Sequence, residues 1–258
     1  MRILISNDDG INAPGIAALV HAVADLGEIF VVAPQTPQSA MAHSITITSP
    51  LTIKHVTLPG EKGYQGISVD GRPADCVRLA LKNLLPDPPD LVLSGINAGE
   101  NSGINVFYSG TVAAAAEAAM NGIPAVAFSL STPGFMAEAD FSTAAFHCRK
   151  VLDKLLEKGL APGSLTNVNI PDLVAHPNPQ KVVVCDQSDA DVDDKYHLVQ
   201  SPEGLDMYHL GDCFSFMNPH HESDVSLLAS GHITVTPLLT NLTNHARLAQ
   251  LRSIFPDE

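Results

Sequence analysis

Short apolar runs alternate with helix-like segments from the start of the chain, and this alternation restricts the possible folds more than any other feature. Residues 3–6 form an apolar run that ends in Asn-Asp-Asp-Gly, which predicts a buried parallel strand followed by a turn. The apolar residues of 15–25 have helical spacing, and Pro14 suits the first turn of that helix. Residues 29–33 predict a second buried strand. This order predicts a β-α-β unit at the start of the chain.

The same alternation continues along most of the chain. Further helices are expected over 74–85, 111–120, 142–158 and 246–254. Further strands are expected over 44–57, 64–69, 91–94, 125–129, 181–185, 196–199 and 233–235. These elements predict an α/β protein with a doubly wound, mostly parallel sheet, a β-rich excursion and a C-terminal helix. No clear linker interrupts the chain, so we expect one domain over 1–258, less regular over 175–258.

The charge of the chain restricts the partners that it can bind. Its 258 residues carry a formal net charge of −14, which disfavours binding to nucleic-acid duplexes through a broad basic surface. A small anionic substrate remains compatible with this charge, because a bound cation can invert the local field. The four cysteines show no C-x-x-C spacing, and no apolar run has membrane-spanning length or signal-peptide form. We therefore expect a cytoplasmic protein with free thiols and no membrane partner.

Small oxygen-bearing side chains follow three of the predicted buried strands. Asp8 and Asp9 follow the first strand, Ser39 lies beyond the second, and Asn97 lies beyond the strand at 91–94. Ligands of an open parallel sheet bind outside the carboxyl ends of its strands, where these side chains would converge. Carboxylate, hydroxyl and amide oxygens are hard ligands that suit Mg²⁺ or Mn²⁺. Taken alone, Asn-Asp-Asp-Gly is equally compatible with an ordinary turn.

A second candidate constellation lies at the start of the helix expected over 111–120. Ser109, Gly110 and Thr111 would present free backbone N–H groups and the positive end of the helix dipole to an anion. Asn101, in the polar stretch before them, is a further candidate for phosphate binding. Simple N-capping explains Ser109 and Thr111 as well. Next to a divalent cation, however, the helix start would hold phosphoryl oxygens while the cation activates a water molecule.

Other motifs offer weaker signals. The segment GISVDGRP lacks the lysine of a phosphate-binding P-loop, and no G-x-G-x-x-G follows the first strand. The acid-rich run 186–194 is most simply a solvated loop, and His220 and His221 are most simply polar surface.

Several segments together resemble the SurE family, the survival-protein nucleotidases. They are NDDGINAPG at 7–15, VVAPQTPQSA at 31–40, GRPADCVRLAL at 71–81, DLVLSGINAGENSG at 90–103, VFYSGTVAAAAEAA at 106–119, NVNIPDL at 167–173 and, more weakly, VTPL at 235–238. The similarity is dense over 1–130 and thin after 175. It implies a Rossmann-like fold and hydrolysis of nucleoside 5′- and 3′-monophosphates.

The resemblance also implies a cofactor and an assembly. It implies one divalent cation per subunit, commonly Mn²⁺ or Mg²⁺, with the metal ligands of the family falling on Asp8, Asp9, Ser39 and Asn97. Asp8 and Asp9 are the expected catalytic residues. Dimers or tetramers that exchange C-terminal elements are implied too, so we expect oligomerisation elements after about residue 230.

The chain departs from the family pattern in its last third. DQSDADVDD stands at 186–194 where relatives carry an arginine-containing segment, Ser201-Pro202-Glu203-Gly204 replaces an Asp-Pro-Arg-Gly turn, and the chain has no tryptophan. These changes leave the expected metal ligands in place and put activity on longer polyanions in question. Two alternatives to a nucleotidase stay open at this point: a nucleotide-sensing module with weak or no turnover, and a metal-dependent glycosyltransferase.

Overall fold

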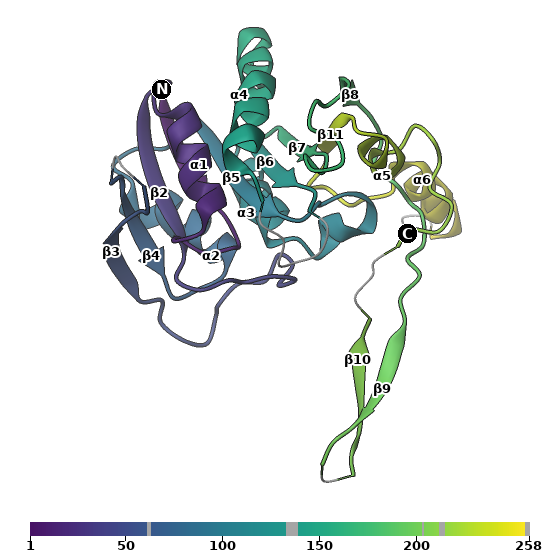
Figure 1. Ribbon diagram of the computed structural model, residues 1–258. Helices are drawn as coiled ribbons and strands as arrows, with labels where there is room; N and C mark the ends of the chain where they lie inside the picture. Colours follow the sequence, from purple (N-terminus) through teal and green to yellow (C-terminus); the bar gives the residue numbers. More distant parts are fainter. Residues whose placement is uncertain (61–62, 133–138, 203, 212–214, 256–258) are drawn as a thin grey trace.

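The computed structural model describes residues 1–60, 63–132, 139–202, 204–211 and 215–255, and its centre is a nine-stranded sheet (Figure 1). Its strands, in spatial order, are β3 (Ile53–Thr57), β4 (Gln65–Val69), β2 (Glu28–Pro34), β1 (Arg2–Ser6), β5 (Leu91–Ala98), β6 (Ala125–Leu130), β7 (Leu165–Ile170), β11 (Ile233–Leu238) and β8 (Val182–Val184). The six from β4 to β7 run parallel; β3 pairs antiparallel with β4, and β11 pairs antiparallel with β7. The expected doubly wound, mostly parallel sheet is therefore confirmed.

Helices cover both faces of this sheet. They are α1 (Pro14–Val23), α2 (Pro73–Leu79) with a π-helical turn η1 (Ala80–Leu84), a 3₁₀ turn η2 (Gly103–Phe107), α3 (Gly110–Met120), α4 (Phe141–Lys158), α5 (Asp224–Ala229) and α6 (His245–Ile254). The apolar side chains of α1 and α4 pack into one core cluster, and those of α2 and α3 pack into another on the opposite face. Burial of both faces explains why the central strands are continuous apolar runs.

The order of the strands reverses beside β1. The chain passes from β1 to β2 on one side, and later returns to place β5 on the other side of β1. In sheets of this kind the crevice at the carboxyl ends of the two diverging strands is the usual ligand site. Asp8 and Asp9, just after β1, and Asn97, at the end of β5, therefore lie at the usual ligand position of this fold.

One expected strand is shorter than the β-branched pattern suggested. Of residues 44–57, only β3 joins the sheet, so the expectation is wrong for 44–52. Thr46 donates its backbone N–H and its hydroxyl to Asp75 instead of to a neighbouring strand. Pro50, which has no backbone N–H, also interrupts any ladder there. This segment is consequently a long loop across the start of α2.

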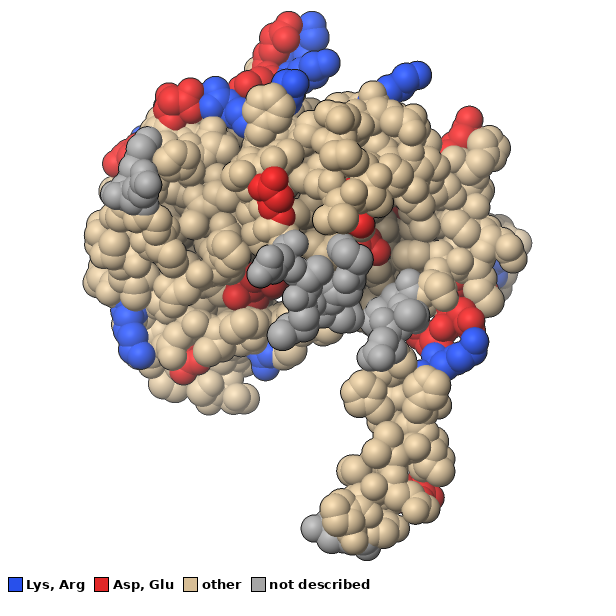
Figure 2. Space-filling model, in the orientation of Figure 1, with Lys and Arg blue, Asp and Glu red and all other residues tan. Residues whose placement is uncertain are grey.

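Part of the C-terminal third lies outside the nine-stranded sheet. Strands β9 (Tyr196–Gln200) and β10 (Asp206–Leu210) form a separate antiparallel hairpin, here called the arm, which projects away from the sheet (Figure 1). Figure 2 shows a largely uncharged surface on the arm. Helix α6 has no buried residue. The sequence pattern predicted β9 and α6 but missed β10 and α5.

Candidate metal and phosphate site

A tight turn directs the two acidic residues away from the end of β1. The side-chain amide of Asn7 donates to the carbonyl oxygen of Gly10 (2.9 Å), and its oxygen accepts from the N–H of Gly10 (3.2 Å). Gly10 has a φ of 97°, a left-handed conformation that favours glycine. Asn7 and Gly10 therefore fix the turn that contains Asp8 and Asp9.

Asp8 is held against the start of helix α3. The hydroxyl of Thr111 donates a short hydrogen bond to Oδ1 of Asp8, and both residues are buried. A methyl group on Gly110 would lie 2.7 Å from Cβ of Asp8, so no side chain fits at this position. The first residues of α3 thus pack closely against the side chain of Asp8, and the positive end of the helix dipole lies nearby.

Burial and mutual repulsion make it unfavourable to ionise the acidic pair. Desolvation, followed by the charge of Asp9, raises the pKa of Asp8 from 3.8 to about 6. Desolvation also raises the pKa of Asp9, although the backbone N–H of Ala98 donates to its Oδ2 (3.1 Å) and partly opposes this effect. Within the described part of the chain, neither carboxylate forms an ion pair. A bound cation would supply the missing positive charge.

The structure brings the segments of Ser39 and Asn97 to the same place. The backbone N–H of Gln38 donates to the carbonyl oxygen of Asp8 (2.7 Å), which places the exposed Ser39 next to this contact. Asn97 lies at the carboxyl end of β5 itself, beside Ala98, which contacts Asp9. The side-chain nitrogen of Asn97 donates to Gly99 (2.7 Å), so its oxygen is the atom left for a ligand.

These donor types fit a hard divalent cation. Two carboxylates, a hydroxyl and an amide oxygen match the preferences of Mg²⁺ and Mn²⁺. Across the described ranges, no group of three or more His, Cys, Asp and Glu side chains gathers as a metal site. His220 and His221 belong to no such group either. The chemistry of the site therefore favours an oxygen-ligated cation over zinc.

The four candidate phosphate residues also have roles within the fold. Oγ of Ser109 accepts from the N–H of Val112 (3.0 Å) and so caps α3, the alternative that its position in the sequence suggested. The side chain of Asn101 is buried and donates to Ser129 (2.8 Å). Gly110 and Thr111 pack against Asp8, so all four residues make contacts that stabilise the fold. Phosphate binding by these four residues stays a prediction.

Two buried asparagines were missed by sequence reasoning. Asn167 and Asn169 lie on β7, and their side-chain amides donate to the carbonyl oxygen of Asn101 (2.7 and 3.2 Å). Oδ1 of Asn169 accepts from the backbone N–H of Asn101 (2.8 Å). They hold the loop after β5 against the ends of the parallel strands. The alternation of asparagine with apolar residues in NVNI is compatible with a strand, but it does not reveal that both asparagines are buried against Asn101.

The fold and this site define a doubly wound α/β protein with oxygen-bearing side chains beside the reversal of strand order. The match to known proteins is more specific. A family model described as survival protein SurE matches residues 3–194, and the chain belongs to the survival protein SurE family. The resemblance drawn from its motifs is thereby confirmed.

Relatives of this family match the chain over nearly its whole length. A protein of Rhodopirellula baltica named 5′-nucleotidase SurE is 42% identical, and the alignment covers 98% of each chain. A protein of the same name from Christiangramia forsetii is 39% identical over 97% of this chain and 95% of its own. The crystal structure of the SurE protein from Aquifex aeolicus superposes with a TM-score of 0.82 at 33% identity, covering 99% of this chain and 100% of that one.

Proposed function

We propose that the chain is a divalent-metal-dependent nucleotidase that hydrolyses nucleoside 5′- and 3′-monophosphates to nucleoside and phosphate. The observation that carries this proposal is the adjacent pair Asp8 and Asp9 at the usual ligand site of the fold, where the two carboxylates have no ion-pair partner in the described part of the chain. The relatives named 5′-nucleotidase SurE support the substrate class.

In this proposal Asp8, Asp9, Ser39 and Asn97 hold one Mn²⁺ or Mg²⁺ per subunit. A cation at this site supplies Lewis acidity, which stabilises charge on a phosphoryl oxygen and lowers the pKa of a bound water. Asp9 is the more exposed carboxylate and is the better placed of the two to orient that water. Thr111 donates to Asp8 and holds its orientation, and in this proposal the N–H groups at the start of α3 bind the phosphoryl oxygens.

Release of inorganic phosphate tests this function. AMP and 3′-AMP should release phosphate with Mn²⁺ or Mg²⁺ present, excess EDTA should abolish the activity, and restored metal should recover it. Full activity in excess EDTA would contradict the metal assignment. Binding of AMP without turnover would instead indicate a sensing module, and turnover of a nucleotide sugar without phosphate release from AMP would indicate a glycosyltransferase.

We further propose that the chain forms a homodimer or homotetramer through the region after about residue 230, with the arm as a second contact. Leu242, Ile254 and Phe255 are 80%, 61% and 73% exposed, a high exposure for large apolar side chains of one short segment. The arm is a two-stranded hairpin, which has little stability without a partner surface. Light scattering at micromolar concentration should find a dimer or tetramer, and a monomer would contradict the proposal.

The surroundings of the protein in the cell are a related proposal. No helix in the described part of the chain has the length and apolar character to cross a membrane. Cys76, Cys148 and Cys185 are free thiols, and Cys213 lies outside the described residues. Free thiols suit a reducing compartment, so we propose the cytoplasm, which fractionation of cells can test.

A further inference from the structure

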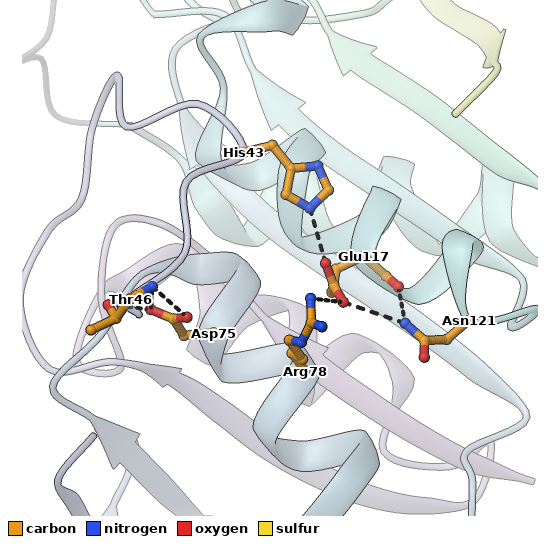
Figure 3. A network of polar contacts seen from close by, with 6 residues as sticks. All are labelled: His43, Thr46, Asp75, Arg78, Glu117 and Asn121. Atoms are coloured by element: carbon orange, nitrogen blue, oxygen red, sulfur yellow. Dashed lines mark hydrogen bonds and ion pairs between the residues drawn. The ribbon is translucent and has the colours of Figure 1, made fainter. Parts of the chain in front are cut away.

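A buried carboxylate lies on helix α3 at some distance along the chain from the proposed metal ligands. The side chain of Glu117 is only 4% exposed, and it contacts three other side chains (Figure 3). Its Oε2 accepts from Nε2 of His43 (3.1 Å), its Oε1 lies 3.6 Å from Nη1 of Arg78, and Nδ2 of Asn121 lies 3.4 Å from the same Oε1. The hydrogen bond with His43 is the largest cause of the lowered pKa of Glu117. Nothing in the proposed mechanism uses this cluster.

His43 comes from the loop that also contains Ser39. Two contacts enclose the short segment between them: on one side Gln38 donates to the carbonyl oxygen of Asp8 (2.7 Å), and on the other Ala42 donates to the carbonyl oxygen of Tyr108 (3.0 Å), directly before His43 meets Glu117. Ser39 lies between these contacts and has an exposed side chain. The position of Ser39 therefore depends on both ends of this segment.

The backbone beside Ser39 needs such contacts. Ala40 and Ala42 have φ values of 55° and 53°, a left-handed conformation that is unfavourable for a residue other than glycine. A loop with two such residues persists only when its surroundings hold it. Release of the His43 end would let this segment relax toward ordinary backbone angles and move Ser39.

Glu117, the partner of His43, lies on helix α3, which also contributes to the candidate site. Glu117 and Thr111 lie on the same helix, and the start of that helix seats Asp8 through Gly110 and Thr111. The contact between His43 and Glu117 thus joins the loop of Ser39 to the helix that orients Asp8. It links two proposed ligands that come from different strand ends.

We propose that His43 and Glu117 are positioning residues that set Ser39 relative to Asp8 and thereby set the affinity of the site for its divalent cation. This inference rests on the proposed metal site. Residues that orient metal ligands typically change metal affinity by about 10- to 100-fold when they are removed. His43 touches neither the cation nor the substrate in this account, so turnover at saturating metal should change much less than affinity.

Calorimetric titration with Mn²⁺ alone tests the proposal on the full chain. His43→Ala should weaken Mn²⁺ binding by about tenfold or more, and His43→Gln, which keeps an N–H donor, should recover part of that loss. Arg78→Ala is the matched control, because Arg78 contacts the same carboxylate from α2 and, among the described residues, forms no ion pair with the loop of Ser39. Its Mn²⁺ affinity should stay within about twofold of the wild type.

The outcomes separate this inference from the proposed function. Wild-type affinity in His43→Ala, or an equal loss in Arg78→Ala, would overturn the positioning role, since a merely stabilising cluster would respond alike to both. If His43→Ala does not fold by circular dichroism, Glu117→Gln, which leaves an amide oxygen for His43, serves with His43→Gln in a double-mutant cycle. Coupling between the two in Mn²⁺ affinity supports the proposal, and additive losses contradict it. A wild type that binds no Mn²⁺ would instead refute the proposed metal site itself.

Discussion

The side chains of the candidate site and those of the arm differ in polarity and in exposure to solvent. Beside the ends of β1 and β5, Thr111 donates to Asp8 and the backbone of Ala98 donates to Asp9, while the acidic pair has no positively charged partner in the described part of the chain. On the arm, by contrast, Tyr196, Leu198 and Tyr208 are 64%, 53% and 67% exposed. The acidic pair calls for a small cation, whereas the exposed apolar side chains of the arm suit contact with another macromolecule. The contrast predicts that the two regions respond to different changes.

Removal of one ligand charge should have the largest effect. Asp9→Asn keeps the shape of the side chain but loses the charge that attracts the cation, so metal affinity and turnover should fall together, with kcat/KM for AMP reduced by roughly 10³-fold. Steady-state kinetics and Mn²⁺ calorimetry measure this. The control is Asp189→Asn, an exposed carboxylate in the acid-rich run, which should change neither quantity. Normal Mn²⁺ binding by Asp9→Asn would remove the acidic pair from the metal site.

Without metal, the ionisation of Asp8 should lower the free energy of unfolding, so that a rise in pH destabilises the protein and Asp8→Asn stabilises it. Because burial raises the pKa of Asp8 from 3.8 to about 6, the folded state binds this proton more tightly than the unfolded state does. The contribution of Asp8 to stability is therefore present at low pH and is lost as the pH rises from about 4 through about 6. At pH 7 in EDTA, Asp8→Asn should raise the free energy of unfolding by up to about 3 kcal/mol.

Chemical denaturation in EDTA, at pH 4 and at pH 7, measures that effect. The stabilisation by Asp8→Asn should be much smaller at pH 4. Added Mn²⁺ should stabilise the wild type and leave the variant unchanged. A variant less stable than the wild type at pH 7 would show that the carboxylate is not destabilised by its burial.

The hydroxyl of Thr111 should have an intermediate effect. Thr111→Val keeps the shape but removes the donor to Asp8, and a hydrogen bond to a charged group is worth about 1.5–3 kcal/mol. We expect kcat/KM for AMP to fall roughly 10- to 150-fold. Thr111→Ser retains a hydroxyl and should retain most of the activity. Equal losses in both variants would point to packing of the methyl group rather than to the hydrogen bond.

Changes on the arm should have the smallest effect on the site. Leu198 and Tyr208 are directly paired across the hairpin. The double substitution Leu198→Ser and Tyr208→Ser therefore removes two adjacent apolar side chains from its surface. Light scattering should show a shift toward smaller oligomers, while Mn²⁺ affinity stays within about twofold of the wild type. Loss of Mn²⁺ affinity would show that the arm of one subunit helps to form a metal site.

The two regions also differ in how far their structure could be predicted from the sequence. Strands such as 3–6 and 125–129 are apolar up to a final serine because both faces of the sheet are covered, so a local pattern is sufficient to find them. Strand β7 was missed because its polar residues Asn167 and Asn169 are buried by contacts to Asn101, which lies more than sixty residues away in the sequence. No local pattern reports such a contact.

The candidate site shows the same limit. Asp8, Asp9 and Asn97 were placed by strand ends alone, because parallel strands end on one edge. The bond between Thr111 and Asp8, and the contact between His43 and Glu117, join segments 103 and 74 residues apart. Residue types indicate candidate ligands, but these two contacts arise only when α3 packs against the sheet and against the loop of Ser39.

The central claim is that a divalent cation binds at the carboxyl ends of β1 and β5. The most direct measurement is an anomalous difference map from crystals of the full chain grown with Mn²⁺. We predict one peak per subunit, bound at about 2.1 Å by oxygens of Asp8, Asp9, Ser39 and Asn97. A map with no peak between these residues, or with its strongest peak elsewhere on the chain, would contradict the account.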